Sequence, residues 1–154
     1  MNILLQPIAV ARNSRKTPED DGWARVNTRL VLADHVPAEA LAGLQSFSHL
    51  EIIYFFHLQS EENIVTGSEH PRENMAWPKV GIFAQRKKAR PNRLGATIVE
   101  LDHVDVSERT IHVRRFDGID GSPILDIKPV MREFLPVSEI RQPGWSSELM
   151  RDYW

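Results

Sequence analysis

The densest group of chemically active side chains is a basic cluster near the middle of the chain. Residues 80–95 read VGIFAQRKKARPNRLG, so an apolar run leads directly into a group of cations. These are Arg86, Lys87, Lys88, Arg90 and Arg93. Guanidinium and ammonium groups form charge-assisted hydrogen bonds with carboxylates and phosphates. The cluster therefore predicts an anionic ligand, and the alternative interpretation is a solvated surface loop.

A second polar segment supplies carboxylates. Residues 117–129 read DGIDGSPILDIKP, in which Asp117 and Asp120 each lie beside a turn-forming glycine. Asp126 and Lys128 fall on one face of a predicted strand, because strand side chains alternate with period two. We expect this segment and the basic cluster to form one polar site. The simpler alternative for Asp126 is an ion pair with Lys128.

Several short motifs recur in an order that resembles one known family. They are FSH at 47–49, FH at 56–57, GIFAQR at 81–86, RPN at 90–92, Gly95, DGSP at 120–123 and DIKP at 126–129. On these motifs the chain resembles the TrmO (TsaA/YaeB-like) family of S-adenosylmethionine-dependent tRNA methyltransferases. The resemblance implies a small β-barrel that acts as a homodimer. It also implies methylation of N6 of threonylcarbamoyladenosine beside the tRNA anticodon.

The cofactor of that family presents an adenine, a ribose, a sulfonium and an amino-acid end. Its site needs an apolar slot, oxygen acceptors and a cation for the carboxylate. By resemblance, the cofactor-binding residues are His57, Leu58, Arg86, Leu94, Gly95, Ala96, Arg114, Phe116 and Asp117. From the residues alone, a histidine after a strand is usually an edge residue, and an aspartate before glycine is usually a turn former.

Methyl transfer to an exocyclic amine requires orientation and a proton acceptor. Orientation alone can supply ~7–11 kcal/mol of the barrier. The N6 lone pair is delocalised, so an acceptor close to the N6 proton assists the transfer. The candidates are Asp117, Asp120, Asp126 and His49, which the sequence does not rank.

The same resemblance assigns the basic cluster to substrate binding. The substrate and RNA residues are Lys87, Lys88, Arg90, Asn92, Arg93 and Lys128. Arg90 and Asn92 would hold the threonylcarbamoyl carboxylate or a neighbouring phosphate, and the other cations would attract the RNA backbone.

Loop bases in RNA usually stack on aromatic side chains, for which Phe83, Phe116 and Trp77 are candidates. Core packing is the alternative for both phenylalanines, and we favour it for Phe83. The chain reads ARPNRLG at 89–95, where the family commonly has FRPNPIG, and Val130 replaces a common tyrosine. These departures remove two aromatic side chains and could alter base stacking.

The hydrophobic periodicity favours strands over helices. We predict strands at residues 3–10, 29–33, 50–58, 80–84, 97–106, 110–116 and 123–127, and helices at 37–44 and 146–153. Residues 59–79 read as a polar loop, either a mobile lid or a disordered connection. With few helices and no GxGxxG motif, the expected fold is mostly β: a single-domain, small antiparallel barrel. Residues 1–135 would form the barrel domain and residues 136–154 a tail with a short helix, packed on the chain or over a partner subunit.

Composition sets broader limits. The net charge is −2, so the chain as a whole does not attract phosphates over long distances. Cysteine is absent and no apolar run approaches ~20 residues, from which we expect a cytoplasmic protein. The histidines lack a His-x-x-x-His spacing, so we do not expect a metal. Two other functions stay open: a methyltransferase acting on a small metabolite, and a non-catalytic RNA- or nucleotide-binding module.

Overall fold

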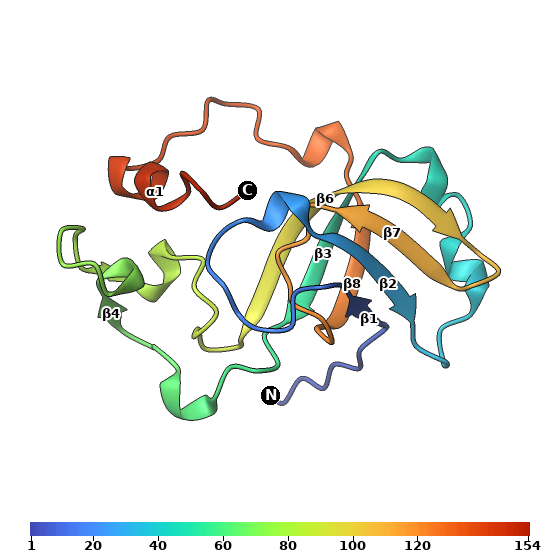
Figure 1. Cartoon of the computed structure of the whole chain (residues 1–154), viewed down its shortest axis with the longest axis horizontal. Helices are drawn as coiled ribbons and strands as arrows, with labels where there is room; N and C mark the ends of the chain where they lie inside the picture. Colours follow the sequence, from blue (N-terminus) through green and yellow to red (C-terminus); the bar gives the residue numbers. More distant parts are fainter.

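The computed structural model describes residues 1–154 as a closed antiparallel barrel with loop-rich segments on one side (Figure 1). The strands follow one another around the barrel in the order β1-β2-β7-β6-β3-β8. Their bounds are β1 Ala9–Arg12, β2 Asn27–Leu32, β3 His49–Phe55, β6 Leu94–Asp105, β7 Thr110–Arg114 and β8 Pro123–Pro129. The predicted small antiparallel barrel is confirmed.

Period-two alternation explains why these segments close around a core. In β2, Thr28, Leu30 and Leu32 point inward and are buried, whereas Asn27 and Arg29 are exposed. The other strands contribute inward residues in the same way, and together they form the main core with Phe116. Its members are Ala9, Ala11, Leu30, Leu32, Leu41, Leu50, Ile52, Tyr54, Val99, Leu101, Ile111, Val113, Phe116 and Ile124.

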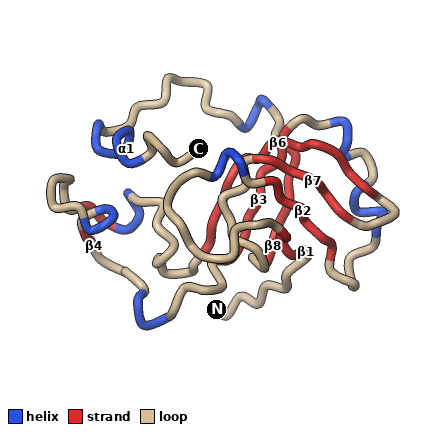
Figure 2. The backbone as a smooth tube through the Cα atoms, viewed as in Figure 1, coloured by secondary structure: helices blue, strands red, loops and turns tan.

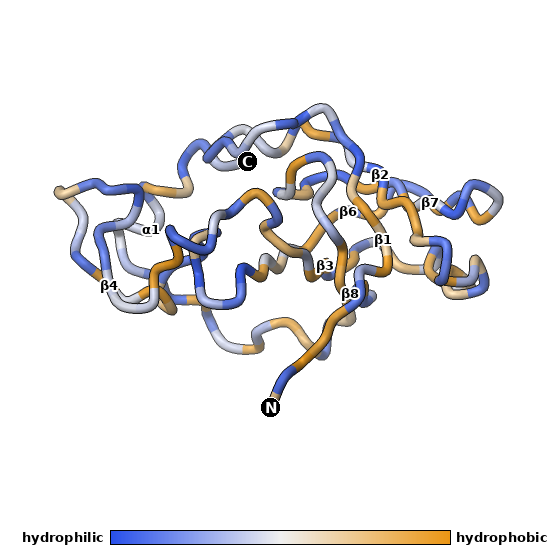
Figure 3. The backbone as a smooth tube through the Cα atoms, turned by 90° about the horizontal axis from the view of Figure 1, so that it is seen from below, coloured by the Kyte–Doolittle hydropathy of each residue, from blue (hydrophilic) through white to orange (hydrophobic).

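Two predicted strands are wrong in extent. Of residues 3–10, only Ala9 and Val10 join a strand, and the preceding apolar residues extend away from the barrel (Figure 3). Leu4 is 97% exposed, because the ladders of β1 with β2 and β8 reach only as far as Ala9. Residues 80–84 form a two-residue strand, β5 (Val80–Gly81), paired with β4 (Ser68–Glu69). A 3-10 helix over Ile82–Ala84 follows, with Ile82 buried and Phe83 exposed.

The helices are shorter than predicted. The 37–44 segment forms a 3-10 helix at Ala38–Leu41, and Gly43 with φ +84° separates it from a second at Leu44–Ser46. The C-terminal helix, α1, spans Gly144–Leu149 and gives way to turns. Further 3-10 helices occupy Trp23–Arg25, Glu61–Asn63, Pro71–Glu73 and Arg132–Phe134. Residues 59–79 thus contain two 3-10 helices and β4 rather than a connection without structure.

The barrel strands gather on one side of the molecule, and β4 lies with α1 on the other (Figure 2). The C-terminal segment docks onto the loop after β1 through main-chain hydrogen bonds. Gly22 N donates to Asp152 O over 3.0 Å, and Trp23 N donates to Tyr153 O over 2.9 Å. No helix has the length and apolar character needed to cross a membrane.

Candidate active site

The centre of the site is the carboxylate of Asp117, in the loop between β7 and β8. Tyr54, on β3, donates its hydroxyl hydrogen bond to Oδ1 over 2.9 Å. Tyr153, from the C-terminal segment, donates to Oδ2. One carboxylate therefore joins the barrel core to the docked tail. Each Asp117 oxygen keeps further lone-pair capacity for a ligand.

Close packing fixes this arrangement. A Cβ placed on Gly95 would lie 2.3 Å from the Tyr54 ring, and one on Gly118 would lie 2.4 Å from the Phe116 ring. Tyr54 and Phe116 meet edge to face with ring centroids 4.9 Å apart. Because neither glycine can carry a side chain without moving a core ring, the Tyr54 hydroxyl is held in a fixed position beside Asp117.

The phenol pKa values of Tyr54 and Tyr153 are both raised above that of an exposed tyrosine. Burial, and then the Asp117 charge, raise the pKa of Tyr54 well above its usual value. The same causes raise the pKa of Tyr153. Both phenols therefore stay protonated and act as donors to Asp117. Arg86, which donates to Ala96 O beside the cross-strand partner of Tyr54, partly opposes both pKa shifts.

His57 lies just after β3 and is partly buried. Its Nδ1 atom is buried without a hydrogen-bond partner. A Cβ on Gly121 would lie 3.5 Å from its Nε2 atom, so the ring packs against the turn that follows Asp120. Burial lowers the pKa of His57 and the nearby Asp120 charge opposes that shift, so the imidazole is neutral near pH 7. The Phe55 carbonyl lies close enough to the ring to oppose the shift as well, and a buried Nδ1 without a full hydrogen bond is available to a ligand.

The other proton-acceptor candidates lie in different surroundings. Asp120 accepts from Lys16 Nζ over 2.8 Å and from Asn13 N over 3.0 Å, and these contacts lower its pKa. Asp126 pairs with Lys128 on β8, which matches the simpler interpretation of both residues. His49 begins β3 and bonds Ser48 Oγ over 2.7 Å. It lies roughly 20 Å along the strand from Phe55, so it is not near His57 or Asp117.

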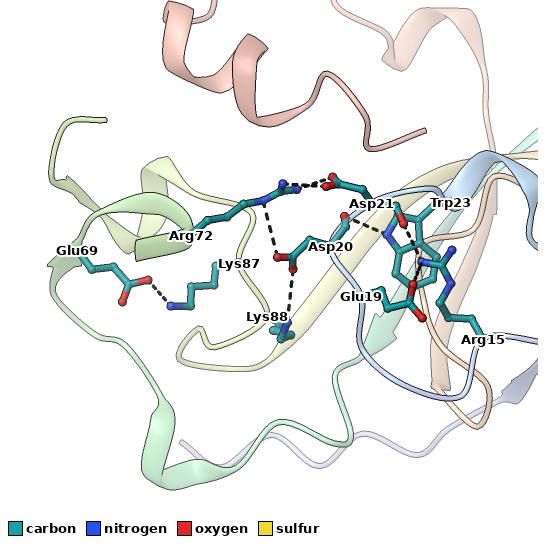
Figure 4. Close-up of polar contacts among 9 residues, drawn as sticks. All are labelled: Arg15, Glu19, Asp20, Asp21, Trp23, Glu69, Arg72, Lys87 and Lys88. Atoms are coloured by element: carbon teal, nitrogen blue, oxygen red, sulfur yellow. Dashed lines mark hydrogen bonds and ion pairs between the residues drawn. The ribbon is translucent and has the colours of Figure 1, made fainter. Parts of the chain in front are cut away.

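The cations of residues 86–93, hereafter the basic turn, each contact the chain itself. Lys87 pairs with Glu69 and Lys88 approaches Asp20 at 3.9 Å (Figure 4). Arg86 donates to Ala96 O, and Arg90 donates to Gln85 O over 2.8 Å. Asn92 is exposed. The turn therefore binds its own neighbours as well as offering charge to a ligand.

Arg93 is the most constrained of these cations. It donates to Gln59 O over 2.9 Å, pairs with Glu61 at 3.0 Å and lies over the Phe55 ring. Its φ is +52°, in the left-handed region. Proline, the residue more common here in the resembled family, has φ fixed near −65° and cannot adopt this conformation. The substitution thus comes with a different local backbone.

The remaining cofactor candidates divide into two groups. Leu94, Gly95 and Ala96 begin β6, opposite Phe55, Tyr54 and Ile53 of β3, and so lie beside the site. Leu58 follows His57 and is exposed. Arg114 instead points outward from β7 and pairs with Glu100 over 3.2 Å. It lines a groove on the barrel wall together with Arg12 and Arg29.

The aromatic candidates differ from our expectations. Phe116 is completely buried and packs in the core, so it offers no face for base stacking. Phe83 is 82% exposed, so the core role we favoured for it is wrong. Trp77 donates its indole N–H to Glu148 of α1 over 2.8 Å.

Sequence reasoning missed both tyrosines. Tyr54 lies inside an apolar strand and resembles an ordinary core residue. Tyr153 is 36 positions from Asp117, with no local motif to connect them. Only the alternation of β3, which points residue 54 inward, hints that the Tyr54 hydroxyl needs a buried partner.

Comparison with known proteins gives the family. The family model of the tRNA-methyltransferase O N-terminal domain matches residues 9–134. Two relatives named tRNA (adenine(37)-N6)-methyltransferase come from Homo sapiens and Escherichia coli. The human protein is 35% identical over 107 residues, which is 70% of this chain and 23% of that protein. The E. coli protein is 34% identical over 111 residues, which is 71% of this chain and 45% of that protein.

A shorter archaeal relative covers more of the chain. It is a probable S-adenosyl-L-methionine-binding protein of Methanothermobacter thermautotrophicus, 34% identical over 132 residues, which cover 84% of this chain and 90% of that protein. The crystal structure of TrmO from Pseudomonas aeruginosa superposes with a TM-score of 0.74 at 25% identity, covering 94% of this chain and 62% of that one. Because the matches cover 23% of the human protein and 45% of the E. coli protein, the chain spans less than half the length of either. By its sequence and its barrel, this chain belongs to the tRNA-methyltransferase O family, in which it corresponds to the N-terminal domain.

Proposed function

We propose that this chain is an S-adenosylmethionine-dependent methyltransferase that methylates N6 of threonylcarbamoyladenosine beside the tRNA anticodon. The observation that carries the proposal is the polar site at the barrel end, which joins Asp117 to two residues of the family's motifs, Arg86 and His57. Support for the reaction comes from relatives named as tRNA methyltransferases and as S-adenosyl-L-methionine-binding proteins.

The site residues fit the proposed cofactor. Arg86 uses one N–H on Ala96 O and keeps others for a carboxylate. Asp117 keeps lone pairs for a hydroxyl or ammonium donor. His57 offers the buried Nδ1 that lacks a partner. Leu58 and the start of β6 add apolar surface. These groups match the carboxylate, the hydroxyls and the aromatic ring of S-adenosylmethionine.

When bound, the cofactor supplies an electrophilic methyl group on sulfur. The protein must orient the acceptor nitrogen and remove its proton. Of the four candidate acceptors, Asp117 is the one beside the Arg86 cation, and it is our choice. The acceptor need not be a strong base, because an amine nitrogen that gains a methyl group becomes strongly acidic.

The basic turn provides the substrate side of the proposal. Asn92 is exposed, and Arg90 keeps donors beyond the one on Gln85 O for the threonylcarbamoyl carboxylate or a phosphate. Lys87, Lys88, Arg93 and Lys128 complete the proposed substrate residues. The exposed ring of Phe83 suits stacking with an unpaired loop base.

We also propose a homodimer in the cytoplasm. Exposed apolar side chains outside the proposed site support the dimer, among them Phe134 and Val137. Residues 1–135 would act as the barrel domain and 136–154 as the tail that supplies Tyr153. The relatives named as tRNA-modifying enzymes support the location.

The first test is transfer of a labelled methyl group from S-adenosylmethionine to two tRNA pools, one carrying threonylcarbamoyladenosine and one an unmodified transcript. We expect N6-methylation, read by mass spectrometry of the nucleosides, in the modified pool alone. Arg86→Ala should weaken cofactor binding, whereas Asp117→Asn should lower turnover more than cofactor affinity. Cofactor binding without transfer to either pool would reject the tRNA substrate.

A further inference from the structure

A row of basic and imidazole side chains crosses the outer wall of the barrel. Arg12 of β1 is the cross-strand partner of Arg29 of β2. Arg29 is in turn opposite His112 of β7, and His112 is opposite His103 of β6. Neighbouring strands lie about 4.8 Å apart, so the row spans roughly 14 Å. Sequence positions 12, 29, 103 and 112 are thereby placed on one surface, hereafter the wall row.

The pairing of Arg12 with Arg29 places two like charges opposite each other. Like charges directly opposite one another on adjacent strands are destabilising. Asp120 lies 3.9 Å from Arg12 but binds Lys16 more closely, at 2.8 Å. Glu100 forms an ion pair with Arg114 and not with either of these arginines. Arg29 is exposed and forms no ion pair, so Asp120, which Arg12 shares with Lys16, is the one acid that pairs with either arginine.

The wall row borders an open groove of about 790 Å³. Its lining holds four cations, Arg12, Lys16, Arg29 and Arg114, but only two carboxylates, Asp102 and Asp120. Val113 is the one hydrophobic residue of the lining. Such a groove has little apolar surface for a hydrophobic ligand and a surplus of positive charge for an anionic one.

The groove borders the loop that carries the candidate active site. Asp120, in its lining, belongs to the same loop as Asp117. Asn13, also in the lining, donates through its side chain to Gly118 O over 2.9 Å and through its main chain to Asp120. An extended anion bound along the wall would therefore reach the loop that carries the proposed proton acceptor.

The far end of the row is shaped by a β-bulge. The register between β6 and β7 shifts between Leu101 and His103, which leaves Asp102 without a cross-strand partner. His103 stacks on His112 with ring centroids 3.9 Å apart and an interplanar angle of 16°. Bulges often re-aim side chains next to functional sites. Here the bulge leaves a flat pair of imidazoles at the end of the wall row.

We propose that the wall row and its groove form a second RNA-contacting surface, which binds the phosphate backbone of the tRNA whose base enters the site at Asp117. RNA fits better than a small anion because the four cations are spread over the groove lining instead of converging on one point, which matches a polymer of phosphates. The inference rests on the proposed tRNA substrate. It also gives Arg114 a phosphate-facing role instead of a cofactor contact.

The test measures tRNA affinity at several salt concentrations for wild type, for Arg12→Gln with Arg29→Gln, and for the conservative Arg12→Lys with Arg29→Lys pair. A matched control, Arg132→Gln with Arg141→Gln, removes the same charge from exposed positions elsewhere. We expect the wall Gln pair to lose roughly tenfold or more in affinity at 0.1 M salt and its log–log salt slope to flatten by about 1–2. The lysine pair and the control should stay within about threefold of wild type.

Each outcome decides the inference. An unchanged affinity and slope in the wall Gln pair would overturn it, and so would an equal loss in the control. Wild type that binds polyglutamate but no tRNA would overturn it in favour of an acidic protein partner. Cofactor binding and methyl transfer are measured on the same samples. Wild type that binds tRNA through the wall without methylating it would defeat the proposed reaction while upholding the RNA surface.

Discussion

The basic turn and the wall row contain similar cations in opposite situations. In the turn, Lys87, Lys88 and Arg93 are close together in the sequence, and each meets an acid of the same chain. On the wall, Arg12 and Arg29 are 17 positions apart, yet strand register places them side by side. Arg12 shares the carboxylate of Asp120 with Lys16, and Arg29 has no acidic partner. Cations that cluster in sequence can serve to hold loops together, whereas cations brought together at a structural cost are better evidence for a ligand.

The largest effect should come from reversing the charge of the wall. Arg12→Glu with Arg29→Glu should lower tRNA affinity about 100-fold or more at 0.1 M salt, because attraction to phosphates becomes repulsion. Lys87→Gln with Lys88→Gln should weaken tRNA binding and flatten its salt slope by less, since Glu69 and Asp20 already engage those lysines. Fluorescence anisotropy with labelled tRNA gives both values. A larger loss in the lysine pair would reverse the comparison.

Loss of a cation should destabilise the fold in the basic turn but not in the wall row. Arg93→Ala removes an ion pair, a hydrogen bond to Gln59 O and a contact with Phe55, and should lower the free energy of unfolding by about 1–3 kcal/mol. Arg29→Ala removes only repulsion with Arg12 and should leave stability within about 0.5 kcal/mol or raise it slightly. Urea unfolding measures both. A destabilised Arg29→Ala would show that the wall is structural.

Tyr153 tests the junction between the barrel and the loop-rich side. Tyr153→Phe keeps the ring but removes the donor to Asp117, and should lower the free energy of unfolding by about 1–2 kcal/mol. Methyl transfer should fall along with stability if the tail completes the site. Trp154→Phe keeps an aromatic ring over Arg115 and serves as the control at the neighbouring position. Full activity in Tyr153→Phe would leave the tail with a packing role only.

The smallest effect concerns pH. Burial, His103 and Arg29 lower the pKa of His112, while Asp102 and Asp105 oppose the shift; burial likewise lowers the pKa of His57. The unfolded chain therefore binds protons first, so stability should decline modestly as pH falls below about 6.5. Urea unfolding at pH 7.5 and 5.5 measures the decline, which His112→Gln should reduce. The pKa values of Asp105 and Asp120 are also lowered, so the stability that these carboxylates contribute is lost only as the pH falls to about 3.8 and below. Equal declines in wild type and His112→Gln would show that His112 does not contribute to the pH dependence of stability.

The sequence determined the barrel and the family of the chain. Alternating segments specify strands with one buried face, and the motifs around Arg86 and Asp117 name the family. The ion pair of Asp126 with Lys128 was also readable, because residues two apart share a strand face. These features depend on local periodicity and short-range spacing.

Only the tertiary structure decided which side chains meet. The two phenols on Asp117 come from a core strand and a distant tail, and the wall row depends on the register of four strands. A one-residue shift of register would move each row to the other face of the sheet. Partner choice over such separations is fixed by closure of the barrel and packing of its core, which no local pattern in the sequence encodes.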